Sequence, residues 1–361
     1  MAIRQQDSAS QSRLQLTDLE AWRKALGRCR PVLTHLNADT TWLVQLPLPR
    51  AERSAGRTTY NILIDPWLRG PQSDVASWFS TQWHLVAPSV GSMAELNAVL
   101  GQLEGGGAPS PSAEGGGQKS GGAQTPYTGK SYIDAVAISH EFTDHCHRAT
   151  LEELPRGTPV FATEKAASLV RSWSHFDRVT TTPGFTGQEK SWQDALGDKN
   201  GALPAWLGIG RVVTPGNALY YHSAVVIAFE LDATEGSPKG KPEAILYSPH
   251  GIESSDLECA AGSGLETLAL LHGLHDVQIW MTKQLNLGGL NGIKAARACG
   301  AKYWIATHDE VKKGGGLIAR FLRRKVYSAQ DAVESLPAGN DEKFKGEFLE
   351  LDSGEAIVLE A

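Results

Sequence analysis

A layered α/β protein, in which helices cover β-sheets, is the fold class that this sequence predicts. Short β-rich runs alternate with helical apolar patterns along most of the chain. The 361 residues are 41% hydrophobic and 20% charged, which is enough apolar material for a sizeable core. Hairpins come first and helix–strand alternation follows, an order typical of sheets that pack under helices.

The elements are expected in the following order. A helix is predicted around Asp18 to Leu26, and the β-rich runs 41–46 and 61–65 look like a hairpin. The middle of the chain predicts strands at 136–138 and 160–162, a helix at 165–173, and strands at 211–213, 219–231 and 245–247. The last part predicts a helix near 265–274, a strand at 277–281, a helix opening at Asn291, a strand at 303–306 and a closing hairpin about 352–355.

One segment, from Glu104 to Lys130, departs from the rest in composition. Nine of the 38 glycines lie between Gly105 and Gly129, and no Val, Ile, Leu, Met or Phe accompanies them. Such a segment has no apolar surface to offset the entropy of ordering it. We therefore expect a disordered insertion within one domain that spans residues 1–361, since β-rich runs that end in candidate site residues flank it.

Composition excludes several classes of protein. The formal charge of −6 disfavours nucleic-acid binding. No apolar stretch approaches the roughly 20 residues of a membrane-spanning helix, and the first residues do not resemble a secretory signal. The four cysteines form no C-x-x-C pair and are expected to be reduced thiols. We expect a cytosolic protein that acts on a small molecule, without membrane or nucleic-acid partners. A basic cluster is interpreted as the solvated face of a helix: Arg320, Arg323, Arg324 and Lys325.

Histidines at strand ends are the most informative feature. His140, His145, His222, His250 and His308 lie in β-rich runs or just beyond them, where rigid scaffolds present site residues. The stretch 139–147 holds three imidazoles and two carboxylates. Neutral imidazole and carboxylate are the ligands that zinc and related ions prefer. The pattern therefore predicts a metal centre.

Two other hydrolase classes do not fit the spacing. An H-E-x-x-H zinc helix needs histidines four residues apart, whereas His140 and His145 are five apart. No G-x-S-x-G elbow is present for a serine nucleophile.

At these residues the chain resembles the metallo-β-lactamase fold superfamily. The stretch His140-x-Phe142-x-Asp144-His145 is similar to its H-x-H-x-D-H signature, with Phe142 in place of the second histidine. Asp65 matches the first-motif aspartate, which orients the site in that family. The order and spacing resemble the branch with ascorbate-phosphate lactonases and phospholipase D-like members. The resemblance implies an αβ/βα four-layer sandwich with the site between two sheets.

The resemblance also assigns the later histidines. His222 corresponds to the third-motif ligand and His308 to the last-motif ligand, while His250 stands where the family has a metal-bridging aspartate. A phenylalanine cannot ligate, and an imidazole offers one lone pair where a carboxylate offers two oxygens. The resemblance therefore implies one tightly bound ion, Zn²⁺ with Mn²⁺ or Fe²⁺ as alternatives.

The implied ligands are Asp144, His145 and His308, with His250 as the fourth. His140 and His222 are further candidate ligands, or hydrogen-bonding and proton-transfer residues beside the ion.

The leading interpretation is a metal-dependent hydrolase of a small-molecule ester, lactone, amide or phosphodiester, in which a metal-activated water attacks. Asp144 or His140 would serve as the base. The alternative is a degenerate member that binds a small molecule or protein partner without turnover, which Phe142 and His250 favour. Residues expected to line the substrate pocket are Phe142, His84, Lys283, Gln284 and Asn286.

Overall fold

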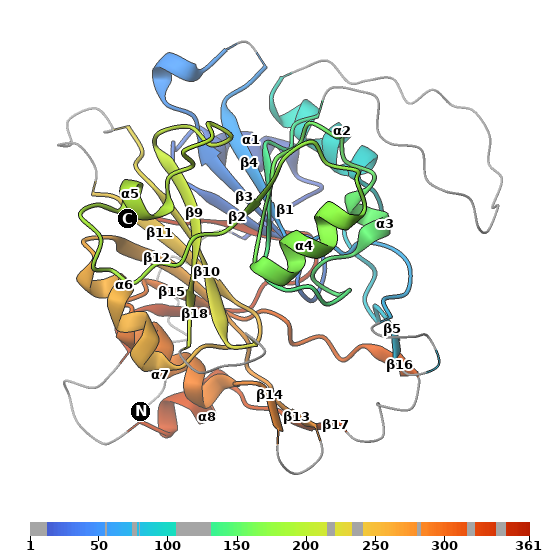
Figure 1. Ribbon diagram of the computed structural model, residues 1–361, viewed down its shortest axis with the longest axis vertical. Helices are drawn as coiled ribbons and strands as arrows, with labels where there is room; N and C mark the ends of the chain where they lie inside the picture. Colours follow the sequence, from blue (N-terminus) through green and yellow to red (C-terminus); the bar gives the residue numbers. More distant parts are fainter. Residues whose placement is uncertain are drawn as a thin grey trace.

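Two β-sheets face each other at the centre of the molecule, and helices cover their outer faces (Figure 1). The structure is a computed structural model. It describes residues 13–54, 56–73, 78, 80–105, 131–214, 221–232, 241–279, 283–315, 322–336 and 344–361. The α/β class and the layered arrangement expected from the sequence are confirmed.

The first sheet has eight strands and combines antiparallel and parallel pairing. Its β2–β3–β4 part is antiparallel, as the early hairpin predicted, and β4, β6, β7 and β8 run parallel. In spatial order the strands are β1 (Leu14–Gln15), β19 (Glu355–Val358), β2 (Val32–His35), β3 (Trp42–Pro47), β4 (Thr59–Ile64), β6 (Ala135–Ile138), β7 (Val160–Ala162) and β8 (Val179–Thr181).

The second sheet has six strands. The β9–β10–β11 part is antiparallel, and β11, β12, β15 and β18 run parallel. In spatial order they are β18 (Glu347–Leu349), β15 (Tyr303–Ile305), β12 (Glu266–His272), β11 (Glu243–Ser248), β10 (Ser223–Phe229) and β9 (Leu207–Val213).

Smaller elements complete the described chain. Two small sheets lie at the periphery in Figure 1. One, at the lower edge, has β14 (Lys283–Asn286), β13 (Asp276–Ile279) and β17 (Leu322–Lys325), and the other, at the right, pairs β16 (Lys313–Gly315) with β5 (Thr81–Trp83). The helices beside the first sheet are α1 (Leu19–Leu26), α2 (Met93–Leu103), α3 (Arg148–Leu151) and α4 (Glu164–Ser172). Those beside the second are α5 (Trp192–Leu196), η2 (Ser254–Leu257), α6 (Glu258–Gly262), α7 (Gly289–Ala298) and α8 (Ala329–Glu334), while η1 (Arg50–Glu52) lies in the β3–β4 loop.

Strand alternation produces the layers. In β10, Val225, Ile227 and Phe229 belong to the apolar cluster between the two sheets, whereas the alternate residues Ala224 and Val226 pack toward the outer helices. A third cluster joins the first sheet to α1, α2 and α4. Burial on both faces explains why the central strands read as continuous apolar runs. Among the described residues, no helix is both long and apolar enough to cross a bilayer.

Three expectations about elements are wrong. The segment 265–274 forms strand β12 instead of a helix, because its apolar run lies between two parallel neighbours and is buried on both faces. Residues 352–355 form a turn but no hairpin, since β18 joins the second sheet and β19 the first. The basic cluster lies on strand β17, paired with β13, with Arg320 outside the described residues.

The proposed insertion begins later than expected. Glu104 ends helix α2 and is buried, and its carboxylate accepts hydrogen bonds from the backbone and hydroxyl groups of Thr58 and Thr59. Residues 106–130 lie outside the described part of the chain, so disorder there stays a prediction, as does the single domain over 1–361.

Candidate metal centre

Carboxyl ends of strands from both sheets meet at the candidate centre. Asp65 directly follows β4, and His140 and His145 follow β6, the parallel neighbour of β4. From the second sheet, His250 follows β11 and His308 follows β15. Parallel strands present their carboxyl ends at one edge of a sheet. The site therefore spans the two sheets, as the resemblance implied.

His145 is held in one orientation by Asp65. Its Nδ1 lies 2.7 Å from Oδ2 of Asp65, and both side chains are fully buried. Asp65 is held in turn by the backbone N–H of Ser139, at 2.7 Å, and by the Ser139 hydroxyl. Burial alone would lower the pKa of His145, but the carboxylates of Asp144 and Asp65 outweigh it and raise this pKa. Because Nδ1 of His145 faces the Asp65 carboxylate, Nε2 points into the centre. This carboxylate–histidine arrangement is the usual support of a metal-binding imidazole.

Two imidazole nitrogens face each other across the centre. Nε2 of His145 lies 3.1 Å from Nε2 of His250, and both rings are buried. Tetrahedral zinc with Zn–N bonds of about 2.0–2.1 Å separates its nitrogen ligands by about 3.3–3.4 Å. His145, His250 and His308 together present ligand atoms within 4.8 Å of one another. The spacing and the donor types of this imidazole group therefore fit a divalent ion.

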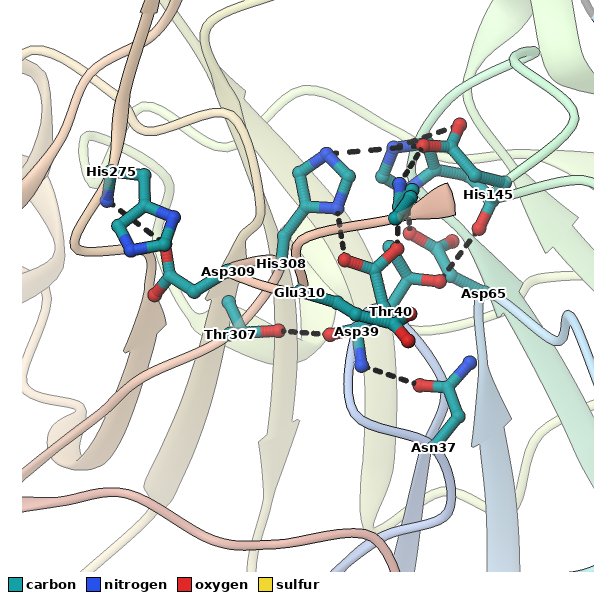
Figure 2. Close-up of polar contacts among 12 residues, drawn as sticks. Asn37, Asp39, Thr40, Asp65, His145, His275, Thr307, His308, Asp309 and Glu310 are labelled. Atoms are coloured by element: carbon teal, nitrogen blue, oxygen red, sulfur yellow. Dashed lines mark hydrogen bonds and ion pairs between the residues drawn. The ribbon is translucent and has the colours of Figure 1, made fainter. Parts of the chain in front are cut away.

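His308 is oriented by a residue that the sequence analysis did not identify. Its Nδ1 lies 3.0 Å from Oδ1 of Asp39, and its backbone N–H donates to the Asp39 carbonyl at 2.9 Å. Asp39 lies in the β2–β3 loop, where its backbone N–H donates to Asn37 (Figure 2). This support leaves Nε2 of His308 directed toward Asp144, 3.9 Å from its Oδ2.

Asp144 stands between the imidazole group and a buried lysine. Its Oδ1 is 3.6 Å from Nε2 of His145, and its Oδ2 is 2.6 Å from Nζ of Lys312. The same ammonium lies 2.7 Å from Oδ2 of Asp39. The Lys312 side chain is 7% exposed and lies over the ring of Trp67. The carboxylate side of the centre thus already contains a positive charge.

The electrostatics of the two sides differ. Burial by itself raises the pKa of Asp144 and of Asp39, but Lys312 and the nearby imidazoles outweigh burial and hold both pKa values below the ordinary range. Burial and the surrounding imidazoles hold the pKa of His250 well below its usual value. The pKa of His140 is lowered in the same way, by burial first and His145 second. Both carboxylates are therefore ionised and both of these imidazoles neutral near pH 7.

Two of the buried imidazole nitrogens have no hydrogen-bond partner among the described residues. They are Nε2 of His140 and Nδ1 of His250. A buried polar atom without a partner is costly and calls for an explanation in a ligand or ion. His140 packs against His250, with ring centroids 4.3 Å apart, but it belongs to neither of the two groups of converging donors.

His222 lies beside the centre rather than in either group of converging donors. Its Nδ1 lies 3.2 Å from the carbonyl oxygen of His250 and donates to it. This bond supports the backbone at His250. The two groups of donors that lie close enough for one ion are His145, His250 and His308, and Asp39, Asp144 and His308.

An aromatic wall lies next to the imidazoles. Phe142 stacks on Tyr221, with ring centroids 5.2 Å apart, and lies 6.0 Å from the ring of His250. The Lys283 ammonium lies 4.9 Å from the centroid of Tyr221. Phe142 and Lys283, two of the predicted pocket residues, are thereby brought to the same wall.

The other predicted pocket residues are engaged with the protein. Nδ1 of His84 is hydrogen-bonded to the carboxylate of Glu310 at 2.7 Å, and its Nε2 to the carbonyl oxygen of Trp67. Gln284 donates to the carbonyl of Asn286, and Asn286 is buried. The loop after Asn286 reaches the centre through the backbone, since the Leu287 N–H donates to the carbonyl of His250 at 2.9 Å.

Backbone conformation marks two of the site residues. Asp65 has φ 43° and His308 has φ 58°, in the left-handed region that non-glycine residues seldom adopt. Strain of this kind concentrates at functional sites.

Sequence reasoning missed Asp39 and Lys312. Asp39 follows a strand, so the strand-end argument that selected the histidines could have found it. Lys312 stands beside Lys313 in a polar stretch, and no spacing signal separates them. His272 ends β12, in the segment predicted to be a helix, and His275 lies in the following loop, with Nδ1 3.5 Å from Oδ1 of Asp309.

A scan against protein-family models and a search of curated proteins found no match. Solved structures do match. A possible metal-dependent hydrolase from Veillonella parvula DSM 2008 is 14% identical with a TM-score of 0.52, over 91% of this chain and 100% of its own. The isothiocyanate hydrolase from Delia radicum gut bacteria is 14% identical with a TM-score of 0.51, over the same shares. The metallo-β-lactamase fold protein YhfI from Bacillus subtilis is 14% identical with a TM-score of 0.44, over 91% and 98%.

The two likenesses with TM-scores of 0.52 and 0.51, together with the two facing sheets, show the fold. The chain has the metallo-β-lactamase fold, as its motifs implied. One of these neighbours is described as a possible metal-dependent hydrolase and another as an isothiocyanate hydrolase, and the His and Asp groups of this chain could hold a metal ion.

Proposed function

We propose that this protein is a metal-dependent hydrolase of a small-molecule ester, lactone, amide or phosphodiester. The observation that carries the proposal is the pair of buried Nε2 atoms of His145 and His250, 3.1 Å apart, with His308 completing a group of three donors. Two imidazole nitrogens at this spacing share either a proton or a metal ion, and the third donor, from His308, favours the metal ion. An imidazole-rich set favours Zn²⁺, with Mn²⁺ and Fe²⁺ as alternatives.

Each part of the centre then has a role. A divalent ion bound there lowers the pKa of a water ligand toward ~7 and polarises a carbonyl or phosphoryl oxygen. Asp65 and Asp39 orient His145 and His308, and Asp144 adds an oxygen ligand. The aromatic wall of Phe142 and Tyr221 excludes water and packs against the substrate.

The proton is handled by His140 or Asp144, and the geometry favours His140. Both carboxylate oxygens of Asp144 already have partners: Oδ2 contacts Lys312, and Oδ1 faces the imidazole group. Nε2 of His140 is buried without a hydrogen-bond partner in the described chain, and the His140 ring lies next to that of His145, with centroids 5.2 Å apart. We therefore assign proton acceptance to His140 and the ligand role to Asp144. The cytosolic location and the resemblance to the lactonase and phospholipase D-like branch remain part of the proposal.

The test is hydrolysis by the full-length protein, stripped with a chelator and reloaded with Zn²⁺, Mn²⁺ or Fe²⁺. The substrates are p-nitrophenyl acetate, an aliphatic lactone, an anilide and bis-p-nitrophenyl phosphate. We expect at least one to be hydrolysed only by the reloaded protein, and His145→Ala to remove that activity. His175→Ala, a half-buried histidine that bonds only the Leu154 carbonyl, is the matched control and should keep it. A protein that retains metal but hydrolyses none of the four would support the non-catalytic alternative.

A further inference from the structure

Two groups of donors share His308, and one of them already surrounds a cation. In the described part of the chain, the donors of Asp39, Asp144 and His308 lie within 4.8 Å of one another, as do those of His145, His250 and His308. The Lys312 ammonium lies 2.7 Å from Asp39 and 2.6 Å from Asp144, so it occupies the space between the two carboxylates. No comparable charge lies between His145 and His250, whose nitrogens face each other directly.

The surroundings of Lys312 fix its ammonium in this place. Its side chain is nearly inaccessible and passes over the Trp67 ring at 5.4 Å. The nearest further carboxylate along the chain, Glu310, is occupied by His84 and by the backbone N–H groups of Leu85 and Val86. Lys312 is therefore committed to Asp39 and Asp144. Removing one partner from such a buried ionic group leaves an uncompensated charge, which is strongly unfavourable.

We propose that Lys312 is the built-in second cation of this centre, so that its ammonium replaces a second metal ion and limits the protein to one divalent ion. This inference rests on the proposed function. Asp144 then bridges two cations of different kinds, with Oδ1 toward the ion on the imidazole side and Oδ2 on the ammonium. A second ion cannot reach Asp39 and Asp144 without displacing the ammonium, because both oxygens that it would bind are at hydrogen-bond distance from Nζ.

The role of Lys312 is one of positioning and charge. A tethered ammonium gives a fixed positive charge with three N–H donors and cannot exchange with solvent ions. One of those donors binds Oδ2 of Asp144 at 2.6 Å, and the ammonium forms an ion pair with Oδ2 of Asp39 at 2.7 Å. The charge beside the catalytic ion is thereby made independent of metal supply.

The experiment measures metal per chain in the full-length protein by mass spectrometry, after saturation with Zn²⁺ and removal of free ion. We expect one ion per chain in the wild type and two in Lys312→Met, which keeps the length of the side chain and removes its charge. Lys302→Met is the matched control, since it removes an ion-paired lysine bound to Glu266 away from the centre, and it should stay at one. The double variant Asp39→Asn/Lys312→Met loses a ligand of the new site and should return to one.

The outcomes separate the two proposals. Two ions in the wild type, or one ion in Lys312→Met, would overturn the role of Lys312 and leave the hydrolase proposal standing. No ion in the wild type would contradict the hydrolase proposal itself, and with it the inference. If Lys312→Met does not fold, the rates of reductive methylation of individual lysines in the wild type test the placement of Lys312. We expect Lys312 to react at least tenfold more slowly than Lys302, and equal rates would refute its place between the carboxylates.

Discussion

The two halves of the centre, one built of imidazoles and one of carboxylates, are completed in opposite ways. On the carboxylate side, Asp39 and Asp144 lie within hydrogen-bond distance of Lys312. On the imidazole side, Nε2 of His145 faces Nε2 of His250 at 3.1 Å, and His308 adds a third donor. Lys312 thus neutralises the two carboxylates, whereas the imidazole group depends on a bound ion.

This difference shows how metal number can be set without loss of ligands. Buried carboxylates need a positive partner, and a lysine four residues after His308 supplies it. Neutral imidazoles need no charge but present lone pairs that only a proton or a metal can use. Metal binding should therefore depend on the histidines, and protein stability should depend on the ionic group.

Loss of an imidazole ligand should have the largest effect on metal affinity. Replacing His145 or His308 by Ala removes a donor from the imidazole group, and we expect Zn²⁺ affinity to fall more than 100-fold, measured by competition with a chromophoric chelator. His222→Ala is the matched control. His222 bonds the backbone of His250 and belongs to neither group of converging donors, so the ion should remain bound with affinity changed by less than about threefold. Equal losses in His222→Ala and His308→Ala would place the ion elsewhere.

A smaller effect is expected from the support behind His145. Asp65→Asn removes the charge that fixes His145, while Asn tolerates the left-handed backbone at φ 43°. Loss of such a carboxylate partner typically lowers metal affinity roughly 10- to 100-fold. The same titration checks this, and circular dichroism confirms the fold. An affinity equal to that of the wild type would show that His145 needs no orienting partner.

The smallest effect concerns a buried imidazole outside the centre. His272 is fully buried, and burial lowers its pKa to about 4. Since the unfolded chain protonates His272 near pH 6.5, the stability that its neutral form contributes is complete above that pH and is lost as the pH falls toward 4. When the pH is lowered from 7 to 5, protonation of His272 should reduce the free energy of unfolding by about 2 kcal/mol.

Urea unfolding of chelator-treated protein measures this loss. The variant His272→Gln has no titratable group at this position. Its free energy of unfolding should therefore fall by about 2 kcal/mol less than that of the wild type over the same pH interval. An identical pH dependence in both proteins would show that His272 is protonated as readily in the native state as in the unfolded chain.

The sequence predicted the fold and one half of the centre. Period-2 and continuous apolar runs located nine of the 19 described strands, among them the central strands β3, β4, β6, β10 and β11. The strand-end rule selected His145, His250 and His308, which the fold brings together. The longest segment predicted wrongly is β12, because its apolar run has a spacing that also fits a helix. Only its neighbours, β11 and β15, decide that it is a strand.

In the carboxylate half only Asp144 was predicted, and its pairing with Asp39 and Lys312 was missed for a different reason. Asp39 and Lys312 are 273 positions apart in the chain, and although Asp39 follows a strand, nothing in the sequence pairs it with Lys312. Their meeting depends on the β2–β3 loop of one sheet and the segment after β15 of the other. Long-range pairing of single charged side chains leaves no periodic signal in a sequence.

The most direct test of one divalent ion on the imidazole side is an anomalous difference map from crystals of the protein grown with Zn²⁺. The account predicts a single strong peak per chain, about 2.0–2.1 Å from Nε2 of His145, His250 and His308. It also predicts density for the Lys312 ammonium between Asp39 and Asp144. A metal peak between those two carboxylates, or none beside the three histidines at saturating Zn²⁺, would contradict it.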